Sequence, residues 1–123
     1  MAKILVIDDE HLARITVRKI LERAGHHVVE AATGLEGLEK FRTEQFDVVI
    51  TDIIMPDMEG VETIGHMKRL KPDQRIIAAS GGGRTRNLDF LALAEQHGAS
   101  RSLAKPFSQG ELLQTVEDVL SAP

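Results

Sequence analysis

The stretch that decides the fold is Ile4-Leu5-Val6-Ile7-Asp8-Asp9, in which four successive apolar residues precede two carboxylates. A run that is apolar at every position predicts a strand covered on both faces, which is typical of a parallel sheet. A strand with one face in water would instead alternate apolar and polar residues. Further runs follow at residues 48–51 and 76–79, more weakly at residues 100–104, and in a more polar form that suits a sheet edge at residues 27–32.

Amphipathic patterns with helical spacing lie between these runs. The first has an apolar stripe consisting of Ala13, Val17, Ile20, Leu21 and Ala24. Gly25 is placed to end that helix, as glycine commonly does after a last turn. The pattern recurs at residues 35–41, 61–70, 88–97 and 111–120. A strand followed by a helix, repeated five times, predicts an α/β fold: a flavodoxin-like, doubly wound, five-stranded parallel sheet of order 2-1-3-4-5 with five helices.

Length and composition narrow the classes of protein that fit. The 123 residues, with 15 Lys plus Arg against 19 Asp plus Glu, predict a single domain over residues 1–123 without an output domain. The net charge of -4 argues against binding to nucleic acid or anionic lipid. The sequence contains no cysteine and no apolar run of about 18 residues, so we expect a cytoplasmic protein with no membrane contact.

Reactive side chains come where the predicted strands end. Asp8 and Asp9 follow the first run, Asp52 follows the run at residues 48–51, Ser80 follows the next, and Lys105 follows the last. In open α/β sheets, ligands bind outside the carboxyl ends of the strands, near the point where strand order reverses. We therefore expect these five side chains to share one edge of the sheet.

This set of side chains predicts chemistry on a phosphoryl group. Three neighbouring carboxylates repel one another unless a cation joins them, and Mg²⁺ is the usual oxygen-preferring partner. Lys105 and Ser80 would add a charge and a hydrogen bond for phosphoryl oxygens. A carboxylate can itself act as nucleophile and form an aspartyl phosphate. Asp52, on the central strand, is the best placed. Taken alone, Asp8 and Asp9 also fit a helix N-cap.

Four motifs in this order make the chain resemble the receiver domains of two-component response regulators, the chemotaxis-regulator-like family, over essentially its full length. The motifs are Asp8-Asp9 after residues 4–7, Asp52-Ile53-Ile54-Met55-Pro56 with Gly60, Ser80 after residues 76–79, and Lys105-Pro106-Phe107. Each motif is weak by itself, but the ordered set is highly specific.

The resemblance implies a role for each acidic residue. Asp52 would accept a phosphoryl group from a sensor histidine kinase or a histidine phosphotransfer protein. Asp9, Asp52 and the backbone carbonyl of Ile54 would hold Mg²⁺, with Asp8 acting through water. Lys105 and Ser80 would contact the phosphoryl oxygens, and a cis bond before the following proline would aim the lysine into the site.

The resemblance also implies a function. The domain would signal through phosphorylation-controlled contact with a downstream protein target, as a monomer or a weak phosphorylation-dependent dimer. It would not be an enzyme beyond catalysing its own phosphorylation and dephosphorylation. Leu12 and Ile15 in the first helix are candidates for a kinase-docking patch.

Two other protein classes share parts of this pattern. A haloacid-dehalogenase-like phosphatase also combines an Asp nucleophile, a Lys and an acidic pair, but its nucleophile lies on the first strand with an acid two residues later. Here that position is Ile54. A flavodoxin-like electron carrier binds phosphate at the loop after the first strand, where Asp8 and Asp9 would repel it.

One residue departs from the family pattern. At the position three residues before Lys105, receiver domains usually carry a Tyr or Phe that changes rotamer on activation. This chain has Ser102 there. The glycines of residues 81–83 offer a different route, because they can lose conformational freedom when the neighbouring Ser80 engages a phosphoryl group. We therefore expect activation to be transmitted through residues 81–84 and the helix that follows.

Overall fold

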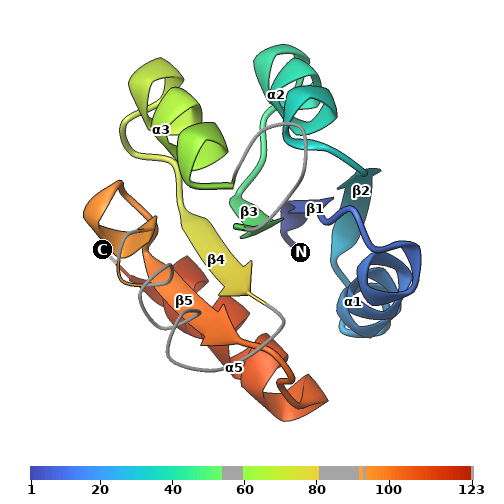
Figure 1. The fold of residues 1–123 in the computed structure, drawn as a ribbon. Helices are drawn as coiled ribbons and strands as arrows, with labels where there is room; N and C mark the ends of the chain where they lie inside the picture. Colours follow the sequence, from blue (N-terminus) through green and yellow to red (C-terminus); the bar gives the residue numbers. More distant parts are fainter. Residues whose placement is uncertain (54–59, 81–91, 93, 123) are drawn as a thin grey trace.

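The computed structural model describes residues 1–53, 60–80, 92 and 94–122. Five parallel strands form one sheet in the order β2-β1-β3-β4-β5 (Figure 1). The strands are β1 (Lys3–Ile7), β2 (His27–Ala31), β3 (Val48–Asp52), β4 (Ile76–Ser80) and β5 (Arg101–Ala104). The predicted doubly wound sheet and its order are therefore confirmed, with the more polar strand β2 at one edge.

Helices alternate with the strands along the chain. Their bounds are α1 (His11–Arg23), α2 (Gly34–Thr43), α3 (Gly60–Leu70) and α5 (Gln109–Ser121). Residues 92 and 94–96 are also helical and belong to the helix expected at residues 88–97. Residues 88–91 and 93 lie outside the described residues, and His97 is in the turn that follows rather than in the helix. Within the described ranges, no helix is long and apolar enough to cross a membrane.

The two faces of the sheet carry separate apolar cores, because side chains along a strand point alternately to opposite faces. Leu5 and Ile7 belong to the core beneath α2 and α3, and Ile4 and Val6 belong to the core beneath α1 and α5 (Figure 1). The helices contribute Leu38, Phe41, Ile64 and Met67 to the first core and Val17, Leu21, Leu112 and Val116 to the second. This double burial explains why β1 is apolar at every position.

Local sequence signals fix where helices begin and end. Gly25 has a φ of 95° just after α1, and Gly98 has a φ of 120°, a backbone region in which a side chain would be strained. The Thr33 side chain caps α2. Ser108 and Glu111 cap α5 reciprocally. The successive strands end at the same edge of the sheet because all of them are parallel.

Candidate functional site

The carboxyl ends of β1 and β3 bring three carboxylates together. The two strands are neighbours and pair Ile7 with Thr51, so the residues that follow, Asp8 and Asp52, lie side by side. Asp9 completes the group: one carboxylate oxygen from each residue lies within 4.8 Å of the other two. Asp8 and Asp52 are buried, whereas Asp9 is exposed. The cluster thus has two fixed members and one that faces solvent.

Asp8 is held by hydrogen bonds through both its backbone and its side chain. Its backbone N–H donates to the carbonyl oxygen of Ala31 at 3.1 Å. Its Oδ1 accepts from the Glu10 backbone N–H at 2.9 Å, and its Oδ2 accepts from Lys105 Nζ at 2.7 Å. The N-cap of α1 is Glu10, whose side chain makes no capping bond. The alternative that Asp8 or Asp9 is the N-cap residue of this helix is therefore wrong, because the helix begins one residue too late for Asp9 and two too late for Asp8.

Lys105 reaches the acidic cluster from β5, two strands away from β3. Its backbone N–H donates to the Ser80 carbonyl oxygen at 2.7 Å, which fixes the start of the side chain at the edge of the sheet. Its Nζ lies 2.7 Å from Asp8 Oδ2 and 3.3 Å from Asp52 Oδ2. The Lys105–Pro106 bond is cis, as the resemblance implied.

The electrostatics of Lys105 follow from these contacts. Its side chain is only 16% exposed, and this burial acts to lower the pKa of the ammonium group. The hydrogen bond to Asp8 and the negative charge of Asp52 outweigh that effect, so the pKa of Lys105 is raised above its ordinary value. Lys105 therefore remains a cation over the whole physiological pH range.

Ser80 occupies the same edge. It is the last residue of β4, which lies between β3 and β5. The register pairs Asp52 with Ala79 and Ser80 with Ala104, so Ser80 lies one residue beyond the level of Asp52. Its side chain is fully buried. The structure thus places this hydroxyl group on the strand beside the acidic cluster, as the sequence predicts.

Gly60 packs against the backbone that carries Asp52. The sequence motif contains this glycine but does not show that the two backbones touch. A Cβ atom at Gly60 would lie 2.2 Å from the carbonyl oxygen of Asp52 and 2.3 Å from Cα of Ile53. The Gly60 backbone N–H also donates to the Ile53 carbonyl oxygen at 3.1 Å. Glycine is therefore required here by space, because real side chains do not approach a backbone that closely.

Several sequence-based predictions fall outside the described residues. They concern the carbonyl of Ile54, which is expected to bind the metal, the turn at residues 55–56 and the loop at residues 81–84. Ser102, which replaces the usual aromatic residue, lies on β5, and its hydroxyl group donates to Glu95 Oε2 at 2.8 Å. This contact joins β5 to the helical residues 94–96, and nothing in the sequence spacing indicated it.

The charges of the site suit a hard divalent cation. Three carboxylates face one ammonium group, which leaves two negative charges uncompensated. Asp9 is exposed, so a carboxylate is accessible to an ion from solvent. Carboxylate oxygens at this spacing are the ligands that Mg²⁺ takes in proteins, usually together with water and a phosphate oxygen. The site can therefore gather a metal ion, a phosphoryl group and a carboxylate nucleophile.

Comparison with known proteins gives the same family from sequence and from structure. Residues 4–117 match the family described as the response regulator receiver domain. The sporulation initiation phosphotransferase F of Bacillus subtilis is 31% identical over 96% of this chain and 93% of its own length. The chemotaxis protein CheY of the same organism is 32% identical over 97% and 98%.

A solved structure agrees with these relatives. The response regulator TrrA of Thermotoga maritima, in complex with Mg²⁺ and BeF, has a TM-score of 0.86 and 31% sequence identity, covering 97% of this chain and 99% of that one. Receiver domains are phospho-acceptor signalling domains, which bind Mg²⁺ through an aspartate cluster and interact with histidine kinases or phosphotransfer proteins and with downstream targets. The comparisons favour neither the phosphatase nor the electron carrier. With its sheet order, its acidic cluster and its relatives in agreement, this chain belongs to the receiver domains of two-component response regulators.

Proposed function

We propose that Asp52 is the phospho-acceptor and that it takes its phosphoryl group from the phosphohistidine of a sensor histidine kinase or a histidine phosphotransfer protein. The observation that carries this proposal is the convergence of Asp8, Asp9, Asp52 and Lys105 at one sheet edge. A carboxylate oxygen of Asp52 forms the new P–O bond as the P–N bond to the donor imidazole breaks. The imidazole keeps the electron pair of that bond and gains a proton from solvent.

The acidic residues divide into two direct metal ligands and one indirect ligand. When bound, Mg²⁺ neutralises charge on the phosphoryl oxygens. Asp9 and Asp52 would bind the ion directly, together with the backbone carbonyl of Ile54. Asp8 would act through a water molecule, and the support for this is that its Oδ1 accepts a hydrogen bond from the Glu10 backbone, a contact that does not depend on Lys105.

Lys105 and Ser80 bind the transferred group. The ammonium group of Lys105 moves from the carboxylates to a phosphoryl oxygen, because the incoming group carries more negative charge than either carboxylate. The Ser80 hydroxyl group donates a hydrogen bond to a second oxygen. The chain thereby promotes its own phosphorylation and dephosphorylation. The phosphorylated domain then signals by binding a downstream protein. It acts in the cytoplasm as a monomer or weak phosphorylation-dependent dimer, and it binds neither nucleic acid nor membrane.

The test is phosphorylation by a small donor. We expect acetyl phosphate with Mg²⁺ to add one phosphoryl group to the whole protein, seen as one mass increment. Asp52→Asn removes the nucleophile, and excess chelator removes the cation that lets an anionic donor approach, so each should abolish the increment. An equal increment in Asp52→Asn, or in the presence of chelator, would overturn the proposal.

The donor protein docks on α1 at Leu12 and Ile15, of which Leu12 is exposed and Ile15 is half-buried. Leu12, close to the acidic cluster in sequence, is 79% exposed, so its side chain is accessible to a partner. We test a panel of autophosphorylated histidine kinases and take the one that transfers fastest to the wild type. Leu12→Asp should slow that transfer by about 10-fold, which corresponds to about 1.4 kcal/mol of lost interface contact. The matched control is Leu35→Asp on α2, where the wild-type side chain is 53% exposed. Labelling by acetyl phosphate should be unchanged in both variants, and equal kinase rates for the two would count against this docking surface.

A further inference from the structure

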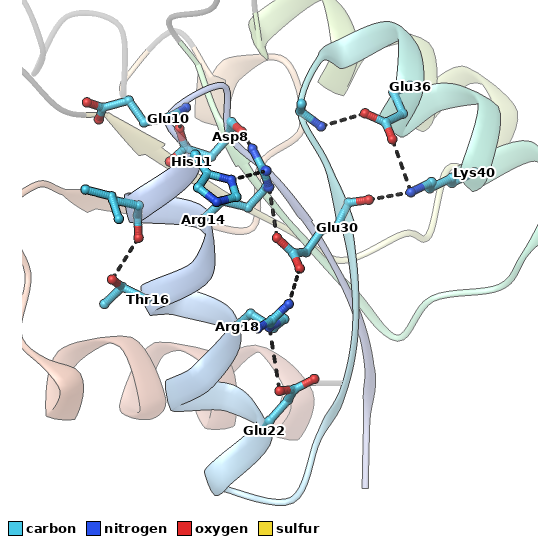
Figure 2. A network of polar contacts seen from close by, with 12 residues as sticks. Asp8, Glu10, His11, Arg14, Thr16, Arg18, Glu22, Glu30, Glu36 and Lys40 are labelled. Atoms are coloured by element: carbon cyan, nitrogen blue, oxygen red, sulfur yellow. Dashed lines mark hydrogen bonds and ion pairs between the residues drawn. The ribbon is translucent and has the colours of Figure 1, made fainter.

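A network of charged side chains connects the acidic cluster to the edge strand β2. Figure 2 shows Arg14 of α1 at its centre, between Asp8 at the end of β1 and Glu30 on β2. We infer that Arg14, oriented by Glu30, is a positioning residue that fixes the turn carrying Asp8 and Asp9 and so sets the affinity of the site for Mg²⁺. The inference rests on the proposed metal site and adds to it two residues that do not touch the ion.

Each nitrogen of the Arg14 guanidinium group has a different partner. NH1 donates to the Asp8 carbonyl oxygen at 2.8 Å, and Nε donates to Glu30 Oε1 at 2.9 Å. NH2 lies 3.0 Å from Nδ1 of His11. The Arg14 side chain is only 13% exposed. A planar group held at three points has one orientation, which a single flexible ammonium could not reproduce.

The contact with the Asp8 carbonyl controls Asp9 as well. That carbonyl belongs to the peptide unit joining Asp8 to Asp9, and a peptide unit is rigid and planar. Fixing its oxygen therefore fixes the direction in which the chain enters Asp9. With this bond, each of the four backbone and side-chain polar groups of Asp8 has a partner: its N–H, its carbonyl oxygen, and both carboxylate oxygens.

Glu30 in turn holds Arg14 in place. It lies on β2 opposite Val6, and its second oxygen accepts from NH1 of Arg18 at 2.6 Å. The Lys40 ammonium group donates to the Glu30 carbonyl oxygen, which anchors the backbone from α2 (Figure 2). Partial burial acts to raise the pKa of Glu30, but the hydrogen bonds from Arg14 and Arg18 outweigh it and hold that pKa below its ordinary value. Glu30 therefore stays charged at neutral pH.

Charge and positioning predict opposite effects for the loss of Arg14. Coulomb repulsion between a guanidinium group and Mg²⁺ means that removing Arg14 would strengthen metal binding if only charge mattered. If Arg14 positions the ligands, its removal weakens binding, because the turn is then free to adopt other orientations. Partners that orient metal ligands typically contribute 10- to 100-fold in affinity. The sign of the change therefore separates the two explanations.

The experiment is calorimetric titration of the full chain with Mg²⁺ at fixed pH and ionic strength, without any phosphodonor. We expect Arg14→Met to raise the Kd by about 10-fold. Lys19→Met on the same helix is the matched control: it removes an equal charge from an exposed side chain that is not part of the network of Arg14, Arg18 and Glu30, so its Kd should stay at or below that of the wild type. Glu30→Gln should also weaken binding, and should add nothing in the Arg14→Met background if Glu30 acts through Arg14.

Circular dichroism establishes that each variant is folded. If Arg14→Met is not, Arg14→Lys replaces it. A lysine lacks the fixed planar set of donors that bonds the Asp8 carbonyl and Glu30 at once, so the Arg14→Lys protein should bind Mg²⁺ more weakly than the wild type. A wild-type or lower Kd in a folded Arg14 variant would overturn the positioning role. Failure of the wild type to bind Mg²⁺, or undiminished binding in Asp9→Asn, would instead overturn the metal site and the inference with it.

Discussion

Replacing Lys105 with methionine is expected to slow phosphorylation of Asp52 by acetyl phosphate by about 100-fold or more, the usual cost of losing one charged contact to a reacting oxygen. The ammonium group lies between Asp8 and Asp52 and is mostly buried, so water cannot easily take its place. Methionine keeps the length of the side chain but cannot bind a phosphoryl oxygen. The measurement is the initial rate of labelling, by mass spectrometry, at saturating Mg²⁺.

The same substitution should change Mg²⁺ binding in the opposite direction. Without the ammonium group, the three carboxylates still attract the ion and one nearby positive charge no longer repels it, so Lys105→Met should bind Mg²⁺ more tightly than the wild type. Lys3→Met is the control, because that lysine pairs with Glu44 rather than with the acidic cluster. A labelling rate in Lys105→Met equal to that of Lys3→Met would exclude the role assigned to Lys105.

The second large effect is expected from Gly60→Ala, which should lower the stability of the fold and slow the labelling of Asp52 by displacing the backbone at the end of β3. The added methyl group would overlap the carbonyl oxygen of Asp52 and Cα of Ile53, and neither can move without the main chain. Forcing an extra carbon into a packed site typically costs about 1 to 3 kcal/mol. We expect at least this loss in the free energy of unfolding, measured with urea, and slower labelling of Asp52.

Gly65→Ala in the same helix is the matched control for this prediction. A Cβ atom there would meet only NH1 of Arg69 at 3.7 Å, so alanine fits without strain. Because glycine weakens a helix interior by roughly 0.5 to 1 kcal/mol relative to alanine, Gly65→Ala should raise stability. Equal unfolding free energies for the two variants would show that the close approach at Gly60 is not a constraint.

Much of this architecture could be predicted because its causes are local in the sequence. Residues 4–7 are apolar at every position because β1 is buried on both faces, and Gly25 ends α1 because the backbone there has a positive φ. The reactive residues could be gathered from the sequence because parallel strands end at one edge of the sheet. Lys105 and Asp8, 97 residues apart, meet for that reason alone.

The rest depends on contacts that sequence spacing does not encode. In the sequence, Arg14 and Glu30 each look like an ordinary exposed residue, one on a helix and one on an edge strand. Only the packing of α1 on β2 shows that Arg14 is hydrogen-bonded both to Glu30 and to the Asp8 carbonyl. The close approach of Gly60 to the backbone of Asp52 and Ile53 likewise depends on how two segments of main chain pack, which the sequence does not show. The start of α1 at His11, rather than directly after Asp8, is set by the Glu10 backbone bond to the Asp8 carboxylate.

The central claim, that Asp52 rather than Asp8 or Asp9 receives the phosphoryl group, is tested most directly by locating the adduct. The protein is phosphorylated with acetyl phosphate and Mg²⁺, then treated with borohydride, which reduces an aspartyl phosphate to homoserine and leaves free carboxylates unchanged. Peptide sequencing by mass spectrometry then identifies the reduced residue. We predict homoserine at position 52 and aspartate at positions 8 and 9; homoserine at position 8 or 9, with position 52 unreduced, would contradict the account.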